Sequence, residues 1–451
     1  MRTVKKGSMT IFLALLMGTF LSVFLILIEG TRIFFLRVEA AQAMELAEFS
    51  VLSEFQRELF CEYGIFAVDL DYEQGNERTD ILKQRIQKYV SANMEEAVSE
   101  NIEVHNFRRL TDQGGIPFFE QAVEEQKIRS GYKAFDEIFE HIETLEMEPV
   151  DLAERLRSHC QEAESICEGY KKEDGTFLFD FLLPQITFPS IQVLTEAVVG
   201  NLNDLSNAEI SLEERLLQRN LLRGVSEEAE PSLMKRKIFV DYLFEHFAHY
   251  GTHDTTIWKE ALSYQIEYII AGNSNDRKNL ENILWRIFLL RAGENYIFFH
   301  QDTKEMMQAE AEAAALVGIT GNLALIDAVR EILLISKAIE TGILETKHIF
   351  AGEKVPLYQK GLLAELKMGY QEYLLLFLTT TERKEMIYRC MDLIELEVRY
   401  HAEYPTFRLD HCTDKFEFCC NYQAEGMFYD LPMSDESGYQ WKMERKAFYE
   451  K

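Results

Sequence analysis

An apolar stretch near the start of the chain constrains the fold more than any other feature. Residues 10–28 carry no charge, and the first eight residues hold three cations. About 20 apolar residues are enough to cross the hydrocarbon core of a bilayer. A secretory signal peptide has a shorter apolar core with a small-residue cleavage site close behind it, whereas the A-x-A tripeptide here lies at 41–43. We therefore predict an uncleaved transmembrane helix over residues 9–29.

The charges on either side of this span predict its orientation. Cations alone precede the span, whereas Glu29 and Glu39 are interspersed with Arg32 and Arg37 behind it. The positive-inside rule then places residues 1–8 in the cytoplasm and everything after the span outside the cell. The sequence predicts a single-pass protein of the cell membrane with an extracellular body, so the lipid bilayer is its first partner.

The helix is expected to continue far beyond the membrane. Residues 33–60 contain no proline and no glycine and are rich in strong helix formers, and the next helix breaker is Gly64. We therefore predict one helix from about Met9 to about Phe60, with residues 30–62 outside the bilayer. This outer part is apolar on several faces, so other protein must cover it. Either the chain's own body wraps it, or copies of the helix pack together.

An acid and a base mark the outer end of the span. Glu29 and Arg32 lie three residues apart on the predicted helix, which allows their side chains to pair. Ionisable groups at this depth are costly and are often functional. Two interpretations are open: an ion pair at the level of the outer headgroups, or contact of Glu29 with a cation on a neighbouring subunit.

The composition is that of a folded, acidic protein. The 451 residues carry a formal net charge of −29, and 47% of them are hydrophobic and 12% aromatic. This charge repels nucleic acid and anionic lipid headgroups, so we exclude nucleic-acid binding. The apolar content is sufficient for a core, and the length allows two or three domains.

The remaining chain predicts a mainly α (α+β) fold in which a helical ectodomain carries a small antiparallel β-sheet. The apolar run 373–378 is too short for a second membrane span and is assigned to the core. Behind the N-terminal helix we expect three regions, namely a helical region with short strands (63–230), a helical bundle (231–403), and a C-terminal β-hairpin with a tail (404–451).

The small sheet is expected to be built around that hairpin. Residues 406–412 and 415–422 alternate in polarity on either side of Thr413-Asp414, a pattern typical of two strands and a turn. The strand-like residues 101–109 are expected to join them.

The first cluster of potential metal ligands lies near the middle of the chain and contains Glu245, His246, His249, His253 and Asp254. His246 and His249 are three residues apart, so on one helix they share a face and can bind zinc with a third ligand. The alternative is that Asp241–Tyr250 is an amphipathic helix with polar histidines. We favour this alternative, because the chain has no H-E-x-x-H motif.

The second cluster contains His411, Cys412, Cys419 and Cys420. On the predicted hairpin, Cys412 lies on the face opposite His411 and Cys420, which disfavours both a metal cluster and a Cys412–Cys419 disulfide. Cys420 is therefore interpreted as a core residue. The chain has seven cysteines, an odd number without a dense disulfide framework, and most are expected to be free thiols.

Motifs of catalysis and of cofactor binding are not found in the sequence. There is no P-loop, no G-x-S-x-G motif, no Rossmann glycine pattern and no cysteine–histidine nucleophile pair. We therefore predict a protein that is not an enzyme and that has no catalytic residue, cofactor or metal.

Two N-terminal stretches, "KGSMTIFLALL" and "EGTRIFFLRVEAAQAMELAEFSVLSEFQRELFCEYGIFAVD", resemble the N-termini of TadE/TadG-like pilin-like proteins of tight-adherence (Tad/Flp) pilus systems. Further stretches, including "IFVDYLFEHFAHYG" and "YLLLFLTTTERKEMIYRCMDLIELEVRY", resemble a family of membrane-anchored proteins of unknown function from Gram-positive anaerobes. Genes of that family tend to lie in Tad/Flp loci. The resemblance covers most of the chain and implies other pilus or assembly subunits as partners.

The sequence departs from the prepilin pattern at one position. Prepilins are cut after a glycine, and a glutamate five residues later is used in assembly. Counted from Gly7, that position holds Phe12. The resemblance therefore implies a minor, capping or assembly role more readily than a major pilus subunit.

Two classes of function remain at this point. The favoured hypothesis is a non-enzymatic pilin-like or accessory component of a Tad/Flp-type pilus or secretion apparatus, which acts by helix packing and protein contacts. The alternative is an outward-facing envelope protein unrelated to pili, such as a metal-dependent hydrolase or a sensor ectodomain.

The favoured hypothesis makes a specific prediction about the first helix. We expect Glu29, Arg32, Phe34 and Phe35 to pack against a partner subunit, or against a second copy in a homo-oligomer. The chain's own body is expected to cover the apolar residues farther along the helix, namely Phe49, Leu52, Phe55 and Leu59.

Overall fold

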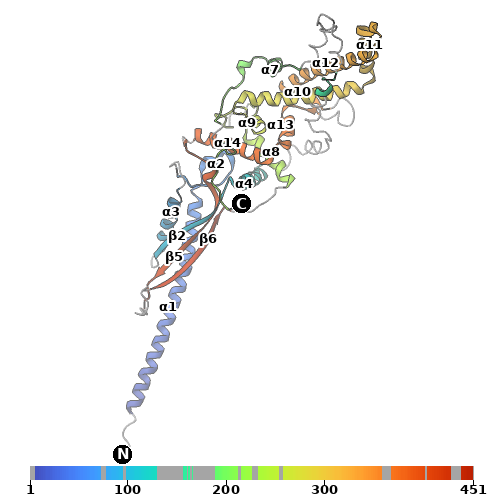
Figure 1. Cartoon of the computed structure of the whole chain (residues 1–451). Helices are drawn as coiled ribbons and strands as arrows, with labels where there is room; N and C mark the ends of the chain where they lie inside the picture. The colour runs from blue at the N-terminus through green and yellow to red at the C-terminus, as the bar shows by residue number, and fades with distance from the viewer. Residues whose placement is uncertain are drawn as a thin grey trace, which may run out of the picture. The chain divides into compact units, whose positions relative to one another are not determined.

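The fold is mainly α with a small antiparallel sheet and a long apolar N-terminal helix, as the sequence predicts (Figure 1). The chain forms two compact units: unit 1 combines residues 1–125, 220–230 and 398–451, and unit 2 combines residues 126–219 and 231–397. Each unit therefore collects segments that are distant in sequence. The computed structural model describes residues 6–72, 78–94, 98–129, 156–159, 161–162, 165, 188–211, 215–225, 232–252, 257–357, 367–401, 404–427 and 438–449.

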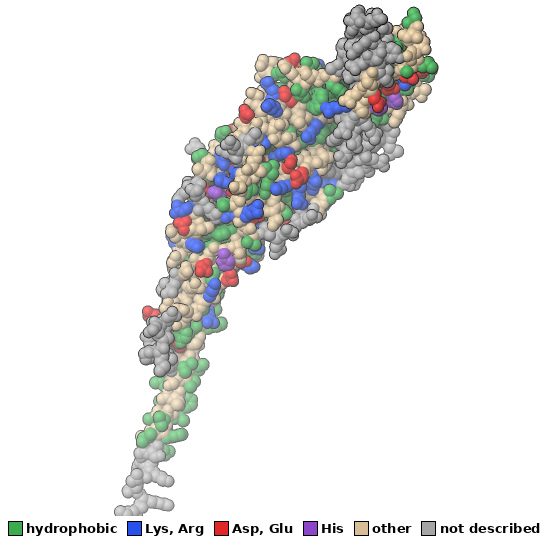
Figure 2. All heavy atoms as spheres, in the orientation of Figure 1, with side chains coloured by type: hydrophobic (Ala, Val, Ile, Leu, Met, Phe, Trp, Pro, Cys, Tyr) green, Lys and Arg blue, Asp and Glu red, His purple; other side chains and the backbone are tan. Residues whose placement is uncertain are grey.

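Helix α1 (Lys6–Leu52) begins unit 1 and is 47 residues long, which corresponds to about 70 Å. Among the described residues it is the one helix long and apolar enough to cross a membrane, as a membrane anchor or a signal sequence does. The side chains of residues 9–28 are exposed, apart from the half-buried Leu25. Figure 2 shows these hydrophobic side chains along the end of α1 that leads to the N-terminus.

Helix α1 ends at Leu52, earlier than the predicted limit near Phe60. A separate short helix, α2 (Arg57–Tyr63), follows it. The backbone N–H of Gln56 donates to the carbonyl of Ala67 over 2.9 Å, so it is taken out of the helical pattern. Three aromatic rings pack together in this turn, with centroids 4.3 to 5.3 Å apart: Phe55, Phe60 and Phe66. Packing between rings in this turn thus overrides the helix propensity of the stretch.

The sheet of unit 1 is antiparallel and has strand β5 (Cys412–Ala424) at its centre. Strand β2 (Val98–Arg109) pairs with one edge of β5, which confirms the predicted strand at 101–109. Strand β6 (Tyr439–Phe448) and the short β1 (Val68–Asp69) pair with the other edge, one after the other. Figure 1 shows α1 running beside these strands.

The predicted hairpin around Thr413-Asp414 is wrong. Both residues lie inside the continuous strand β5, and Thr413 is paired with Val68 on one side and Arg109 on the other. The guanidinium of Arg108 donates to both carboxylate oxygens of Asp414, over 2.9 and 2.6 Å. This pairing with strand β2 holds the segment extended. The partner strand lies about 300 positions earlier in the chain, so the local sequence does not reveal it. Residues 409–411 form a 3-10 turn, η5 (Leu409–His411), where a strand was expected.

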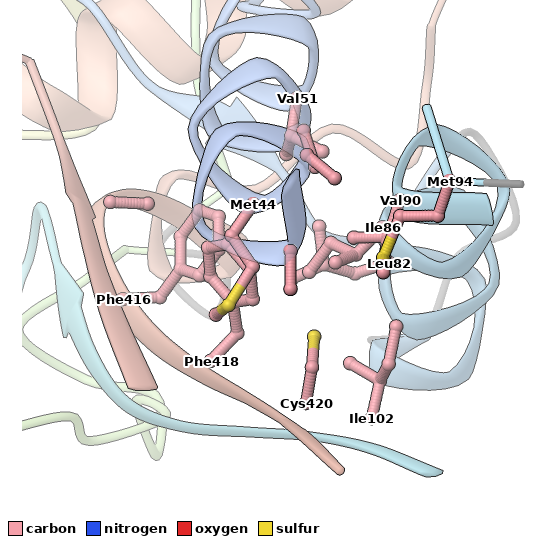
Figure 3. Packing of buried hydrophobic residues seen from close by; sticks show 14 of the residues in the cluster. Met44, Val51, Leu82, Ile86, Val90, Met94, Ile102, Phe416, Phe418 and Cys420 are labelled. Atoms are coloured by element: carbon pink, nitrogen blue, oxygen red, sulfur yellow. The ribbon is translucent and has the colours of Figure 1, made fainter. Parts of the chain in front are cut away.

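The core of unit 1 lies between α1, the sheet and helix α3 (Thr79–Ala92). Figure 3 shows Met44 of α1 beside Phe416 and Phe418 of β5, with residues of α3 on the other side of the cluster. Cys420 is fully buried, which confirms that it is a core residue. The face of α1 that meets this core combines alanines, which allow close approach, with larger apolar side chains: Leu36, Ala40, Ala43, Met44, Ala47, Val51 and Leu52.

Polar contacts fasten the C-terminal strand to the same helix. Arg445 of β6 forms an ion pair with Glu48 of α1. The hydroxyl of Tyr449, just beyond β6, donates to the carbonyl of Leu52 over 2.8 Å. The last strand of the chain is thus tied to the first helix at two points.

Helix α4 (Asp112–Arg129) begins with a left-handed stretch in which Gln113, Gly114 and Gly115 all have positive φ. The carboxylate of Asp112 accepts hydrogen bonds from the backbone N–H groups of Arg109 (2.7 Å) and Gly224 (2.8 Å). At Gly224 an added Cβ would lie 2.1 Å from a backbone oxygen, so only glycine fits there. These contacts tie the segment around Gly224 to unit 1.

Unit 2 is helical, and the buried Arg291 marks the packing of its two longest helices. Its guanidinium lies 2.7 Å from the carboxylate of Glu345 and 2.6 Å from that of Glu294. Residues 373–378 are buried within a helix, as expected for core. The elements are α7 (Ile191–Val199), η2 (Leu202–Asp204), α8 (Leu233–His246), α9 (Gln265–Ala271), α10 (Asp276–Gln301), α11 (Thr303–Val317), η3 (Gly318–Thr320), α12 (Leu323–Phe350), β3 (Val355–Pro356), β4 (Lys367–Met368), α13 (Tyr370–Thr380) and most of α14 (Arg383–His401).

Candidate functional site: the exposed face of the N-terminal helix

Beyond residue 29, helix α1 has an exposed face that is also apolar. Phe34 and Phe35 are 63% and 64% exposed, so the body of the chain does not cover them. We refer to the exposed apolar side chains of this part of α1 as the outer strip: Phe34, Phe35, Val38, Leu46 and Phe49. The outer strip continues the exposed apolar surface of residues 9–28 without a break in the helix. Apolar surface of this kind on a helix is typical of a packing site.

The expectation that the body covers Phe49, Leu52, Phe55 and Leu59 is correct only in part. Leu52 and Leu59 are buried, and Phe55 is half-buried. Phe49 is 61% exposed, so the expectation for it is wrong. It points away from the sheet, because α1 meets the core through the face that carries Ala47 and Val51.

Glu29 and Arg32 pair with each other, at 3.3 Å, and both also hold a distant part of the chain. Arg32 Nη1 donates to the carbonyl of Glu425 over 2.9 Å. The backbone N–H of Met427 donates to Glu29 Oε1 over 3.2 Å. Glu29 is only 3% exposed as a result. These four residues form what we call the clasp, which anchors the segment that follows β5 to α1, so the structure gives Glu29 and Arg32 partners within this chain.

The histidine-rich segment does not form the predicted helix over Asp241–Tyr250. Helix α8 ends at His246, and Phe247 is already extended, so His246 and His249 do not share a helix face. The ring of His249 contacts the carbonyl of Tyr250 through Nδ1 (2.7 Å) and the side chain of Gln371 through Nε2 (2.9 Å). Burial lowers the pKa of His249. Its ring therefore serves as a structural link; His253 and Asp254 lie outside the described residues.

The second predicted cluster of metal ligands, around Cys412 and Cys420, does not form, because strand β5 keeps these residues apart. Cys412 and Cys420 are eight residues apart on β5, which corresponds to about 26 Å. One metal ion therefore cannot bind both thiols. This separation argues against a metal cluster more strongly than the predicted difference of faces does. The cysteines in the described part of the chain do not form disulfides, as expected for most of the seven: Cys61, Cys390, Cys412, Cys419 and Cys420. Cys160 and Cys167 lie outside that part.

Unit 2 contains buried carboxyl groups that the sequence did not indicate. Burial raises the pKa of Glu267 to about 7, and Glu267 accepts hydrogen bonds from the Tyr370 hydroxyl (2.5 Å) and the Tyr250 N–H (2.7 Å). Burial likewise raises the pKa of Asp392 to about 7 while it accepts from the N–H of Leu216 over 2.8 Å. These groups bind loop backbone to helices, so their perturbed pKa values have a structural explanation.

Unit 2 also carries a hollow of about 530 Å³, formed where α7 meets the first turns of α10. The hydroxyl of Ser190, its one lining hydroxyl, caps α7 by accepting from the N–H of Val193. The residues that line the hollow are Pro189, Ser190, Ile191, Asn273, Lys278, Glu281, Asn282 and Trp285. This set does not include a nucleophile paired with a base.

A comparison with known protein families assigns the chain to one of them. The model of a family described as a family of unknown function (DUF5702) matches residues 190–424, more than half of the chain. The chain belongs to this family. The DUF5702 match runs from the start of α7 to the end of β5, so α1 and β2 lie before it and β6 lies after it. No curated protein matches the chain, and no solved structure matches it.

Proposed function

We propose that this DUF5702 protein is a non-enzymatic, membrane-anchored component of a Tad/Flp-type pilus or secretion apparatus. In this proposal residues 9–29 cross the cell membrane with the N-terminus in the cytoplasm, and the two units lie outside. The observation that carries the proposal is the outer strip: α1 is packed against the sheet on one face, while its other face stays apolar and exposed.

The outer strip supports a protein partner for energetic reasons. Burial of one large apolar side chain contributes about 1.5–3 kcal/mol. Phe34 and Phe35 are nearly two-thirds exposed, so a partner helix that covers both gains several kcal/mol before entropy is subtracted. The occupant we propose is the N-terminal helix of another pilus or assembly subunit, anchored in the same membrane. A second copy of this chain is the other outcome that the experiment distinguishes.

Phe12 supports an accessory role within such an apparatus. In the resemblance to prepilins, Phe12 stands where a glutamate is used for assembly. An apolar residue at this depth is compatible with lipid and cannot supply that charge. A minor, capping or assembly component does not depend on that glutamate.

The test compares two pairs of exposed apolar residues in the full-length protein, isolated from its native membrane. Phe34→Ser with Phe35→Ser should lower the recovery of pilus-assembly subunits several-fold, while the melting temperature stays nearly unchanged. The matched control is Ile319→Ser with Leu323→Ser, an exposed apolar pair of unit 2, which should change neither. Equal recovery for both variants would refute the proposal, as would a loss confined to monomer stability. Recovery of tagged copies of this chain alone would identify a homo-oligomer.

A further inference from the structure

The sheet of unit 1 carries a group of potential metal ligands on the side away from α1. His105 of β2 lies opposite Glu417 of β5 in the strand register, and Glu444 of β6 lies opposite Cys419, two residues along. The core side chains of β5 are Phe416, Phe418 and Cys420, so Glu417 and Cys419 point to the other face of the sheet. His105, Glu417 and Glu444 thus come together from three neighbouring strands; we call them the sheet triad.

The distances within the sheet triad fit one small metal ion. His105 Nε2 lies 3.1 Å from Glu444 Oε1 and 3.8 Å from Glu417 Oε2. All three ligand atoms lie within 4.8 Å of one another. Ligands that bind zinc tetrahedrally at about 2.0–2.2 Å are separated by about 3.4 Å. The two histidine distances lie on either side of this value, so small side-chain rotations bring all three atoms onto a common ion.

A β-bulge shapes the backbone at this position. The pairing of β2 with β5 is irregular between His105 and Arg108, and Asn106 has a left-handed φ of 55°. Consecutive residues of a regular strand point to opposite faces. Here both His105 and Asn106 reach Glu417, and Asn106 Nδ2 donates to Glu417 Oε2 over 2.7 Å. Bulges commonly redirect side chains in this way at functional positions.

Two neighbouring side chains, Lys446 and Asn106, hold the carboxylate of Glu417 in position. Lys446 Nζ lies 2.9 Å from Glu417 Oε1. The Lys446 ammonium and the Asn106 amide therefore fix the orientation of the Glu417 carboxylate. Partners that orient a ligating carboxylate are a regular feature of metal sites. The side chains of His105 and Glu444 are 38% and 56% exposed, which leaves the position open to an ion from solution.

We propose that the sheet triad, His105, Glu417 and Glu444, is a binding site for a divalent transition metal ion, with Zn²⁺ as the preferred occupant. The imidazole nitrogen disfavours Mg²⁺ and Ca²⁺, which take oxygen ligands, whereas Zn²⁺ binds histidine and carboxylate together. Three protein ligands leave a fourth position for water. A bound ion links β2, β5 and β6 across the sheet. This site is independent of the outer strip.

A purely ionic contact is the competing explanation. The contacts of His105 with the two carboxylates can also exist without any metal. The two explanations differ in solution: a metal site takes up Zn²⁺ and is stabilised by it, whereas a plain ionic contact does not bind Zn²⁺.

The experiment titrates the full-length protein in detergent micelles with ZnCl₂ at neutral pH, against a chromophoric chelator. We expect one equivalent of Zn²⁺ to bind and to raise the melting temperature, and excess MgCl₂ not to displace it. His105→Ala and Glu444→Gln should each weaken this binding by on the order of tenfold or more and abolish the thermal shift. The matched control is His348→Ala, which removes an exposed histidine paired with Glu353 at 2.8 Å and should leave binding unchanged.

Each result has a defined meaning. Zn²⁺ affinity that is the same in the wild-type protein, His105→Ala and Glu444→Gln would overturn the proposal, because the ion would then bind elsewhere. Lack of Zn²⁺ binding by the wild-type protein would also overturn it and leave the ion pair as the explanation. If His105→Ala fails to fold, the exposed Glu444→Gln variant decides alone.

Discussion

The inner and outer faces of helix α1 are both apolar beyond residue 29, yet only the inner face is covered by the chain itself. The inner face carries alanines at 40, 43 and 47 between larger side chains such as Leu36, Met44 and Leu52, and it meets the sheet and α3. The outer face carries the rings of Phe34, Phe35 and Phe49 and is exposed. The alanines of the inner face thus allow close packing, whereas aromatic rings lie on the face that the chain leaves open.

The two faces therefore have different roles, one in packing within the chain and one in contact with a partner, and the sequence alone does not distinguish them. Small residues on the inner face allow close approach of helix and sheet, and a change of volume there is costly. Phenylalanine rings on the outer face offer a large apolar area that contributes to stability only when something covers it. The four predictions below test this division, from the largest expected effect to the smallest.

The largest effect is expected on the inner face. Met44→Ala and Leu52→Ala each remove buried methylene groups of the unit 1 core, so each should lower the free energy of unfolding by about 2–5 kcal/mol. Chemical denaturation of the full-length protein in micelles measures this. A loss below about 0.5 kcal/mol in both variants would mean that α1 is not packed as described.

A second prediction uses pH to distinguish the apolar inner face from the core of unit 2. The pKa of Glu267 is raised from 4.5 to about 7 by burial, so the folded state holds this proton more tightly than the unfolded state. The group therefore stabilises unit 2 fully below pH 4.5, and the contribution is lost as the pH rises through 7. The loss is on the order of 3 kcal/mol.

The measurement for this prediction is hydrogen exchange of α9 and of the α1 inner face between pH 5 and pH 8, corrected for intrinsic exchange rates. Protection of α9 should fall with rising pH in the wild-type protein and fall less steeply in Glu267→Gln, while the α1 inner face stays unaffected in both. An equally steep pH dependence in Glu267→Gln would assign the effect to other groups.

A smaller effect is expected at the clasp. Arg32→Ala removes the donor to the Glu425 carbonyl and the partner of Glu29, with a cost of about 1–2 kcal/mol. Hydrogen exchange at the Met427 amide, which donates to Glu29, should become faster, while exchange in the α1–α3 core does not change. Unchanged exchange at Met427 would show that the clasp does not hold this segment.

The smallest effect on stability belongs to the outer strip. Phe34→Ser with Phe35→Ser should change the free energy of unfolding of the isolated protein by less than about 0.5 kcal/mol, as is usual for exposed positions. Denaturation in micelles under the conditions used for Met44→Ala gives the direct comparison. A loss as large as that of Met44→Ala would remove the distinction between the two faces.

Local features of the fold could be predicted from the sequence, because they depend on neighbouring residues. The breaker-free composition predicts the long α1, the strand-like residues at 101–109 predict most of β2, and the six apolar residues at 373–378 predict core. The Glu29–Arg32 pair also follows from helical spacing.

Features set by distant contacts could not be predicted in the same way. The hairpin at Thr413-Asp414 was wrong because Arg108, about 300 positions earlier, holds that segment extended. The end of α1 is determined by rings that meet only in the folded turn. The sheet triad joins His105 to Glu444, which lie 339 positions apart, and only the register of three strands brings them together.

The central claim is that the outer strip of α1 is a surface for another subunit, and site-specific photo-crosslinking in the native membrane tests it most directly. A photoreactive phenylalanine analogue at position 35 should form a covalent adduct with a second polypeptide. The same analogue at position 49 maps how far the contact extends along the strip. An analogue in place of Met44 on the inner face should crosslink only within the chain. Adducts with another subunit at position 35, and not at position 44, are the predicted result; crosslinking of position 35 to lipid or to its own chain alone would contradict the account.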